Sequence, residues 1–231
     1  MKSYITLISS DEYLIGLLSL LKQLKHYESK YSMCILYTDN LKEETKSKIK
    51  ETNCNVIEIP NLGLEKTQHN WHNTFSKLEI FNQTQFGKLV YLDVDILLRS
   101  NVDELFDHEH LSMCWFGSEH KNLKLYNSGV MVLKPNKSDY DSLFKFFYEC
   151  LSKGKVRHIF LKTDKQIISY ILNDDINELD NIYNMDSRDT KTENPKIVHF
   201  VKDSKPWNKS YKPMNDKQKI YIDEWKKITH E

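Results

Sequence analysis

The stretch KLVYLDVDILLRS, Lys88–Ser100, places two aspartates one residue apart within an otherwise apolar run. Its first part, Lys88–Leu92, has the apolar composition of a buried strand, and Asp93 follows this segment directly. Residues i and i+2 of an extended segment point the same way, so Asp93 and Asp95 can face one point. Two carboxylates so placed repel each other unless a cation lies between them, and hard divalent ions take oxygen ligands. The stretch therefore predicts a strand that ends at a metal site.

The first sixty residues alternate between strand-like and helix-like patterns. Three strands are predicted, over Tyr4–Ile8, Ser32–Thr38 and Asn55–Pro60. A leucine-rich helix follows the first strand, and a charged helix with Asn40 and Glu43 as its N-terminal capping pair follows the second. This β-α-β-α-β order implies a parallel sheet with right-handed crossovers. Ligands of open α/β sheets collect outside the carboxyl ends of the strands, which is where Asp93 should lie.

The residues after position 60 predict a mixed second half. A polar loop is expected over 61–73, and the spacing of Phe75, Leu78 and Phe81 indicates a helix. Later strands are predicted over 110–116, 128–134 and 196–200, and later helices over 138–151 and 163–172. No linker rich in Pro, Gly or Ser divides the chain, so we expect one domain that covers residues 1–231.

The composition argues against several classes of protein. The 33 basic and 33 acidic residues balance, which argues against a nucleic-acid or anionic-membrane partner held by bulk charge. No apolar run approaches the ~20 residues that span a bilayer, and the N-terminus lacks a signal-peptide pattern. The four cysteines form no C-x-x-C pair, so we expect reduced thiols, three of them in the core, and a cytoplasmic protein. The six glycines form no phosphate-binding loop.

The aspartate pair, taken alone, has other interpretations. Both carboxylates could be helix caps or loop residues. A calcium-binding EF-hand is excluded, because Leu97 and Leu98 occupy the positions of a required ligand and of the required glycine. An aspartyl-phosphate phosphohydrolase would use Asp93 as its nucleophile. In that class the pair usually follows the first strand, whereas three predicted strands precede it here.

Five segments together resemble the glycogenin-like glycosyltransferases, the retaining nucleotide-sugar enzymes of family 8. In chain order they are TLISSDEY (6–13), FSKLEIF (75–81), YLDVDILLRSNVDELF (91–106), YNSGVMVLKP (126–135) and VHFVKDSKPW (198–207). They resemble, respectively, the family's uridine-binding start, its T-K-L segment, its D-x-D strand, its N-S-G strand and its H-F-x-G-x-x-K-P-W signature. The resemblance extends from Thr6 to Trp207, which is nearly the whole chain.

The resemblance implies a nucleotide-diphospho-sugar transferase fold, a Rossmann-like α/β domain with a central, mostly parallel mixed sheet flanked by helices. Residues 1–95 would form the nucleotide-binding half and residues 96–231 the half on the sugar and acceptor side. The implied reaction transfers a hexose from a UDP-sugar, with UDP-glucose the expected donor, and retains the anomeric configuration. Asp93, Asp95 and His199 would hold the metal, and an imidazole among oxygens favours Mn²⁺ over the alternative Mg²⁺. Without the resemblance, a lone histidine on an apolar strand would be interpreted as a core residue.

The resemblance also implies roles for the other site residues. Asp164 and Lys77 would be catalytic, with Asp164 nearest the reacting sugar. Tyr13 would lie against the uracil ring, and Lys205 would donate to the diphosphate. The full set predicted to bind the nucleotide sugar is Leu7, Ser9, Ser10, Tyr13, Lys77, Asp93, Val94, Asp95, Asn127, Ser128, Lys165 and Lys205. A structural role stays open for Asp164, because the segment Thr163–Gln166 is also a capping-box pattern.

Four departures from the family pattern bear on activity. The family's D-Q reads Asp164–Lys165 here, Lys202 stands at the glycine of the last signature, and Ser10 replaces an asparagine. The segment 184–195, which corresponds to the region of glycogenin's self-glucosylated tyrosine, has no tyrosine, although Tyr183 lies just upstream. We therefore expect a separate acceptor (a glycan, a protein or a polyol) and not a self-glucosylating glycogen primer. The first two departures favour one alternative, a catalytically silent sugar-nucleotide-binding protein. The resemblance suggests a homodimer.

Overall fold

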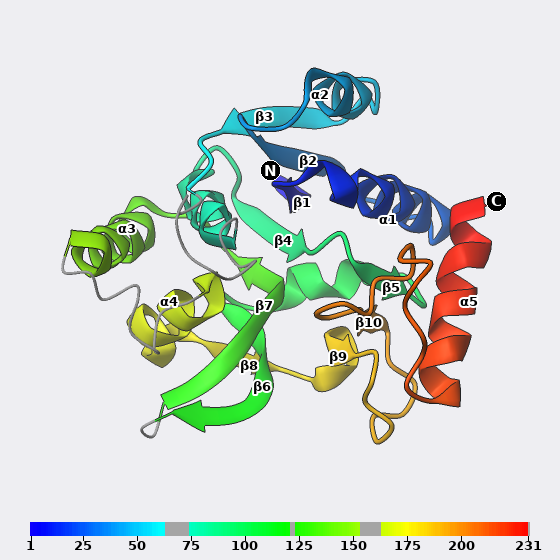
Figure 1. Cartoon of the computed structure of the whole chain (residues 1–231). Helices are drawn as coiled ribbons and strands as arrows, with labels where there is room; N and C mark the ends of the chain where they lie inside the picture. The colour runs from blue at the N-terminus through cyan, green and yellow to red at the C-terminus, as the bar shows by residue number, and fades with distance from the viewer. Residues whose placement is uncertain (63–73, 121–122, 153–162, 231) are drawn as a thin grey trace.

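The computed structural model describes residues 1–62, 74–120, 123–152 and 163–230. Its largest feature is a sheet with the strand order β3-β2-β1-β4-β7-β6-β8 (Figure 1). The strands of this sheet are β1 (Lys2–Ile8), β2 (Met33–Thr38), β3 (Asn55–Ile59), β4 (Lys88–Leu92), β6 (Ser112–His120), β7 (Leu123–Leu133) and β8 (Asn177–Leu179). Strands from both halves of the chain thus pair in one sheet, with β4 beside β7.

All strands of this sheet except β7 run in the same direction. β1 pairs in parallel with β2 and β4, β2 pairs in parallel with β3, and β6 pairs in parallel with β8. β7 is antiparallel to both of its neighbours, β4 and β6. A parallel leading half followed by a mixed second half is the predicted arrangement, so the predicted fold class is confirmed.

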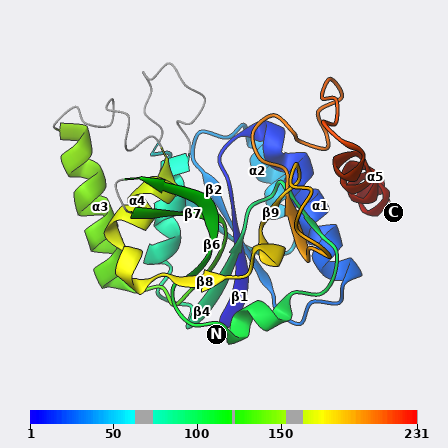
Figure 2. The same ribbon diagram turned by 90° about the horizontal axis from the view of Figure 1, so that it is seen from below.

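Helices cover both faces of the sheet (Figures 1 and 2). The helices are α1 (Leu14–His26), α2 (Glu43–Lys50), α3 (Lys137–Ser152), α4 (Asp164–Ile171) and α5 (Asp216–His230), with 3-10 helices η1 (Asp11–Tyr13), η2 (Thr74–Asn82), η3 (Asp103–Asp107), η5 (Asn173–Asp175) and η6 (Asn181–Tyr183). Leu17 and Leu20 of α1 pack with Tyr4 of β1 on one face. On the other face, Phe75 of η2 packs with Tyr91 of β4. Two apolar cores therefore enclose the strands that lead to Asp93.

A second, three-stranded sheet follows the carboxyl end of β4. It consists of β5 (Ile96–Leu98), β10 (Ile197–His199) and β9 (Met185–Asp186), with β10 in the middle. His199 pairs with Ile96, the residue after Asp95. Helix α5 buries Trp225 against this sheet and also contacts α1, where Ser19 and Thr229 share a 2.8 Å hydrogen bond. The small sheet therefore carries a histidine from late in the chain to the aspartate pair.

The structure corrects some of the local predictions. The predicted cap pair of the second helix is wrong, because α2 begins after Lys42 and no side chain caps it. The helix expected around Phe75–Phe81 is a 3-10 helix, which fits the three-residue spacing of its apolar side chains. Strands β5, β8 and β9 and helix α5 were not predicted, and most of the predicted loop 61–73 lies outside the described residues.

Two predictions from composition are tested by the structure. All four cysteines are free thiols, and three of them, Cys34, Cys114 and Cys150, are buried as expected. In the part of the chain that the structure describes, no helix combines the length and the apolar character needed to cross a membrane.

Candidate active site

The aspartate pair lies at the carboxyl edge of the main sheet, as predicted from the sequence. Asp93 follows the last residue of β4, and its backbone N–H donates to the carbonyl of Gly129 on β7 at 2.8 Å. The carbonyl of Asp95 accepts a 2.9 Å hydrogen bond from the backbone N–H of Phe200. The turn that carries both carboxylates is therefore held by two strands that are distant in the sequence.

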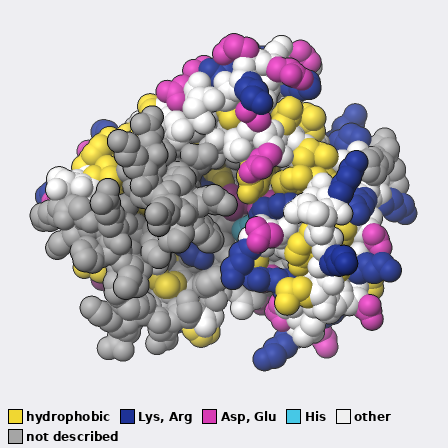
Figure 3. Space-filling model, viewed as in Figure 1, with side chains coloured by type: hydrophobic (Ala, Val, Ile, Leu, Met, Phe, Trp, Pro, Cys, Tyr) yellow, Lys and Arg dark blue, Asp and Glu magenta, His cyan; other side chains and the backbone are white. Residues whose placement is uncertain are grey.

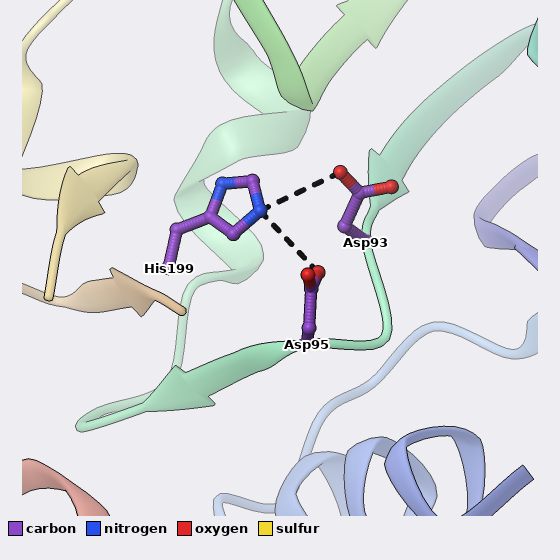
Figure 4. Close-up of side chains that lie close together, drawn as sticks. All are labelled: Asp93, Asp95 and His199. Carbon is purple, nitrogen blue, oxygen red and sulfur yellow. Dashed lines mark ion pairs between the residues drawn. The ribbon is translucent and has the colours of Figure 1, made fainter. Parts of the chain in front are cut away.

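His199 lies beside both aspartates (Figure 4). Its Nε2 is 3.3 Å from Oδ1 of Asp95 and 3.7 Å from Oδ2 of Asp93. One ligand atom from each of the three side chains lies within 4.8 Å of the others. Carboxylate oxygens and an imidazole nitrogen suit a divalent ion such as Mn²⁺. The residues present therefore fit a metal site, and the predicted ligand set is brought together.

A glycine leaves the room that this cluster needs. A Cβ at Gly129 would lie 2.3 Å from Cε1 and 2.5 Å from Nδ1 of His199, and 3.1 Å from Oδ2 of Asp93. Those distances are shorter than van der Waals contact, so a side chain at this position would displace the imidazole. The close approach of β7 to the histidine gives a physical reason for the glycine of the N-S-G segment.

Two lysines neutralise the carboxylates from opposite sides. Lys205 forms a hydrogen-bonded ion pair with Oδ2 of Asp95 and donates to the carbonyl of Phe200 at 2.6 Å. Lys77 donates to Asp93, with its Nζ 3.0 Å from Oδ1 and 3.2 Å from Oδ2. Each aspartate therefore has an ammonium group on one side and the histidine on the other.

The charges in this cluster shift the pKa values of its members. Burial alone would raise the pKa of the Asp95 carboxyl, but the charges of His199 and Lys205 hold it below its ordinary value. Burial alone would lower the pKa of the Lys77 ammonium, yet the neighbouring carboxylates, Asp164 first, raise it above its ordinary value. The cluster therefore contains ionised groups of both signs at neutral pH.

Lys77 links the aspartate pair to Asp164 at the start of α4. Its Nζ is 3.6 Å from Oδ2 of Asp164, and the same oxygen accepts a 2.6 Å hydrogen bond from the hydroxyl of Ser128. Asp164 is 3% exposed. Thr163 is the N-cap residue of α4, as the capping-box pattern predicts, but its side chain makes no capping hydrogen bond. The carboxylate of Asp164 points instead into the cluster with Lys77.

The residues predicted to bind the nucleotide base lie at the end of β1 and just after it. Leu7 is the penultimate residue of β1, Ser9 and Ser10 come after the strand, and Tyr13 ends η1. The Nζ of Lys205 lies 5.8 Å from the centroid of the Tyr13 ring. Leu7 and Ser10 stay predictions for the far end of a nucleotide.

Trp207 connects this region to helix α1. Its ring meets that of Tyr13 edge-on with centroids 5.8 Å apart, and a Cβ at Gly16 of α1 would lie 2.8 Å from Cη2 of the indole. The same Cβ would lie 2.7 Å from the carbonyl oxygen of Val94. The K-P-W segment therefore packs its tryptophan onto α1, which places Lys205, two residues earlier, beside Asp95.

The two lysines that depart from the family pattern border the same region. Lys202 has φ = 56°, the left-handed conformation that glycine adopts readily, so the loop keeps the backbone expected of the family's glycine. Lys165 is half-buried in the first turn of α4. Burial lowers the pKa of Lys165; the Asp164 carboxylate opposes this shift, and the charges of Lys77 and Lys202 add to it. The sequence departures therefore add positive charge on the side of the cluster that holds Asp164.

Two further residues of this site were not identified from the sequence. The hydroxyl of Tyr91, on β4, donates to Oδ1 of Asp93. Oδ1 of Asn184 lies 2.9 Å from Nδ1 of His199. Strand alternation could have indicated Tyr91, because it precedes Asp93 by two residues and shares its face. No sequence pattern connects Asn184 to a histidine fifteen residues later.

One face of the molecule carries a hollow with charged side chains (Figure 3). Figure 3 shows a hollow near the middle of this face, with acidic and histidine side chains inside and lysine or arginine side chains at its rim. A substrate with both anionic and neutral polar groups would therefore meet charges of both signs.

The comparisons with known proteins agree with this geometry. Residues 4–210 match the profile of the family described as glycosyl transferase family 8. The chain belongs to glycosyltransferase family 8. Members of this family are transferases that use nucleotide sugars and generally depend on a divalent metal, so the family assignment and the Asp93, Asp95 and His199 cluster support each other.

Several curated proteins are similar in sequence. Glycogenin-1 of Mus musculus is 27% identical over 92% of this chain and 67% of its own length, and glycogenin-1 of Homo sapiens is 28% identical over 92% and 64%. Inositol phosphorylceramide glucuronosyltransferase 1 of Arabidopsis thaliana is 30% identical over 62% of this chain and 26% of its own length. The chain thus spans about two thirds of the two glycogenins that it matches.

Solved structures share the fold at lower sequence identity. The galactosyltransferase LgtC, in complex with donor and acceptor sugar analogs, matches with a TM-score of 0.75 at 16% identity, over 100% of this chain and 95% of that one. The glycosyltransferase GlyE of Streptococcus pneumoniae matches with a TM-score of 0.70 at 17% identity, over 100% and 63%. These matches confirm the nucleotide-sugar transferase fold that the sequence predicted.

Proposed function

We propose that this family 8 enzyme is a metal-dependent, retaining glycosyltransferase that moves a hexose from a UDP-sugar, with UDP-glucose the expected donor, to a separate acceptor. The observation that carries this proposal is the convergence of half-buried Asp93 with buried Asp95 and His199 at the edge of the sheet, with Lys77 and Lys205 on either side. A divalent cation and nearby ammonium groups stabilise the charge of a nucleotide diphosphate. This cluster supplies three ligands for the cation and two ammonium groups.

Asp93, Asp95 and His199 would hold the ion, with Mn²⁺ expected and Mg²⁺ as the alternative. A divalent ion at this position neutralises charge on a departing diphosphate. With a divalent ion held by Asp95, the ammonium of Lys205 would be available to donate to the diphosphate. Lys77 would stay between Asp93 and Asp164 and keep both carboxylates in place, because it already contacts both at 3.0 Å and 3.6 Å.

The proposed reaction is a front-face displacement at the anomeric carbon. The bond between that carbon and the β-phosphate oxygen breaks, and the acceptor hydroxyl forms its bond on the same face of the sugar. The departing phosphate oxygen takes the hydroxyl proton, so the products are UDP and a glycoside of retained configuration. Asp164, held by Ser128 and Lys77, would face the sugar, and Lys77 would stabilise charge near the breaking bond.

The remaining predicted residues would bind the other parts of the donor. Tyr13 would lie against the uracil, and Leu7, Ser9, Ser10 and Val94 would line the base and ribose. Asn127, Ser128 and Lys165 would contact the sugar or phosphates. The side-chain oxygen of Asn127 accepts a 2.9 Å hydrogen bond from the backbone N–H of Gly129, so its amide nitrogen remains to serve as a donor.

A separate acceptor fits the environment of Tyr183 better than self-glucosylation does. Tyr183 is 8% exposed, and its hydroxyl donates to Glu104 at 3.2 Å. A tyrosine that accepts a sugar must bring its hydroxyl to the anomeric carbon, whereas this hydroxyl is occupied inside the fold. We therefore infer a glycan, protein or polyol acceptor from outside this segment.

A panel assay tests the proposed function. The protein would be incubated with UDP-glucose, UDP-galactose, UDP-xylose, UDP-glucuronate and UDP-N-acetylglucosamine, with and without Mn²⁺, and UDP release measured against candidate acceptors. We expect Mn²⁺-dependent release with at least one donor, and an α-configured product detected by NMR. Failure of every UDP-sugar to bind or react would contradict the proposal. Binding of UDP with Mn²⁺ and no turnover of any donor would instead favour the catalytically silent alternative.

The phosphohydrolase alternative makes a different prediction. It requires Mg²⁺-dependent hydrolysis of phosphomonoesters that Asp93→Asn abolishes. The family assignment favours the transferase.

Three further predictions remain. The chain should form a single domain, with its nucleotide-binding half at 1–95 and its sugar and acceptor half at 96–231. We also expect a cytoplasmic location and a homodimer. Light scattering coupled to size-exclusion chromatography would test the last of these.

A further inference from the structure

We propose that Tyr91 and Asn184 are positioning residues that determine which atoms of Asp93 and His199 face the metal. This inference rests on the proposed function, because it concerns the metal that the aspartates and the histidine would hold. Neither residue belongs to the predicted ligand set, and both are buried, at 1% and 6% exposed. Residues that hydrogen-bond to metal ligands commonly fix the orientation and protonation of those ligands.

Asn184 determines the tautomer of His199. The Nδ2 of Asn184 donates to the carbonyl of Asn127 at 3.4 Å, which leaves Oδ1 of the amide facing Nδ1 of His199 at 2.9 Å. An amide oxygen can only accept, so Nδ1 of the imidazole must carry the proton. In the neutral ring, Nε2 then has a free lone pair. That atom is the one that lies 3.3 Å from Asp95 and 3.7 Å from Asp93.

Tyr91 orients the carboxylate of Asp93. The tyrosine hydroxyl donates to Oδ1, and the Nζ of Lys77 also lies nearest that oxygen, at 3.0 Å. Oδ2, which faces the imidazole of His199, receives no hydrogen bond from the tyrosine. Lys77 also lies 4.8 Å from the centroid of the Tyr91 ring, so the ring and the hydroxyl support the same pair. Oδ1 therefore receives the tyrosine hydroxyl and the shorter contact of Lys77, while Oδ2, which Lys77 reaches at 3.2 Å, is directed toward the metal position.

The two positioning residues come from separate parts of the fold. Tyr91 lies on β4 in the main sheet, whereas Asn184 directly precedes β9 of the small sheet. Each ligand is thus oriented by the sheet that carries it. Loss of either contact should weaken metal binding without disturbing the other ligand, and the two losses should be roughly additive in free energy if the sheets act independently.

Metal affinity, measured without any sugar donor, tests the inference. Mn²⁺ would be titrated into wild-type protein, Tyr91→Phe and Asn184→Leu, and free Mn²⁺ followed by electron paramagnetic resonance. We expect each variant to raise the Mn²⁺ Kd by about 10- to 100-fold. Asn184→Asp keeps an acceptor for the Nδ1 proton, so its Kd should stay within about threefold of wild type or become tighter.

A second buried tyrosine supplies the matched control. Tyr4 donates its hydroxyl to Asp103 at 2.8 Å and is 0% exposed, but it lies on the other face of the sheet. Tyr4→Phe should lower the melting temperature and leave the Mn²⁺ Kd unchanged. Wild-type Mn²⁺ affinity in both Tyr91→Phe and Asn184→Leu would contradict this inference and leave the proposed function standing. If wild-type protein itself binds no Mn²⁺, the proposed metal-dependent function fails, and the inference fails with it.

Discussion

Two buried tyrosines on neighbouring strands each hold an aspartate, and the surroundings of the two aspartates differ. Tyr4 of β1 binds Asp103, whose oxygens also accept from the Ser29 hydroxyl at 2.8 Å and the Lys30 backbone N–H at 2.9 Å. These donors are electrically neutral and fixed by the fold. Tyr91 of β4 binds an aspartate whose other partners carry or can carry positive charge.

The difference separates a structural carboxylate from a functional one. Neutral, fixed donors satisfy Asp103 permanently, so it ties η3 to the loop after α1. Asp93 and Asp95 are balanced by the ammonium groups of Lys77 and Lys205 and by His199. Under the proposed function, Lys205 would exchange Asp95 for a phosphate when a metal arrives, which a backbone N–H inside a turn cannot do. The site is therefore arranged to accept a cation and an anion together.

Removal of one carboxylate charge from each region should give the largest difference in turnover between the two regions. Asp95→Asn leaves shape unchanged but removes a predicted metal ligand, so we expect turnover of the UDP-sugar to fall by about 100-fold or more. The matched variant Asp103→Asn should leave turnover within about twofold and lower the unfolding free energy by roughly 1–3 kcal/mol. UDP-release kinetics and urea unfolding measure the two effects. A comparable loss of turnover in both variants would remove the distinction.

The fit of Gly129 against the imidazole gives the next largest effect. In Gly129→Ala the new methyl group would meet the ring at 2.3 Å, so we expect the Mn²⁺ Kd to rise by at least about tenfold as His199 is displaced. Gly87 is the control, because a Cβ there would meet its nearest atom at an ordinary 3.4 Å. Isothermal titration with Mn²⁺ compares them. Unchanged affinity in Gly129→Ala would show that the histidine is not held where the structure places it.

Lys202, in the loop after β10, offers a test with a smaller expected effect on stability. Its φ of 56° is unfavourable for a residue with a Cβ, so Lys202→Gly should stabilise the fold by roughly 0.5–1 kcal/mol. Lys209, an exposed turn lysine outside the left-handed region, should gain nothing from the same change. Thermal unfolding measures both. A stability gain that comes with lower turnover would show that the lysine side chain, and not the loop shape, contributes to activity.

The pH dependence of stability gives the smallest expected difference. Burial would raise the pKa of Asp103, but hydrogen bonds from the Lys30 backbone, Ser29 and Tyr4 hold it below its ordinary value. A carboxyl with a depressed folded pKa stabilises the protein above its unfolded pKa, about 3.9, and this stabilisation is lost as pH falls through the folded pKa. The unfolding free energy of wild type should therefore decrease more than that of Asp103→Asn between pH 6 and pH 3. Parallel curves would contradict this.

The sequence predicted the elements whose signals are local. The apolar strand before Asp93 and the leucine-rich helix were predicted because periodicity depends on neighbours in the chain. Helix α5 was not predicted, because charged and polar residues surround its few buried side chains, such as Trp225 and Ile222. Strand β9 is two residues long and forms only by pairing with β10, so its sequence carries no pattern of its own.

The residues of the candidate site also divide into those with a local sequence signal and those without one. Asp93 and Asp95 were identified from strand alternation, whereas His199 was identified only through the family resemblance, since nothing local distinguishes it from a core histidine. The role of Asn184 depends on the pairing of β9 with β10, a contact between distant segments. Lys202 stands where the family signature has glycine, and its positive φ of 56° is the backbone conformation that glycine adopts readily.

The most direct test of the account is a crystal structure of the protein with UDP and Mn²⁺, with the anomalous signal of manganese used to locate the ion. We expect one manganese bonded to Asp93, Asp95, His199 and both phosphates of UDP, with Lys205 moved from Asp95 to the diphosphate. Ordered UDP with the manganese elsewhere, or bound without any ligand from the aspartate pair, would contradict it.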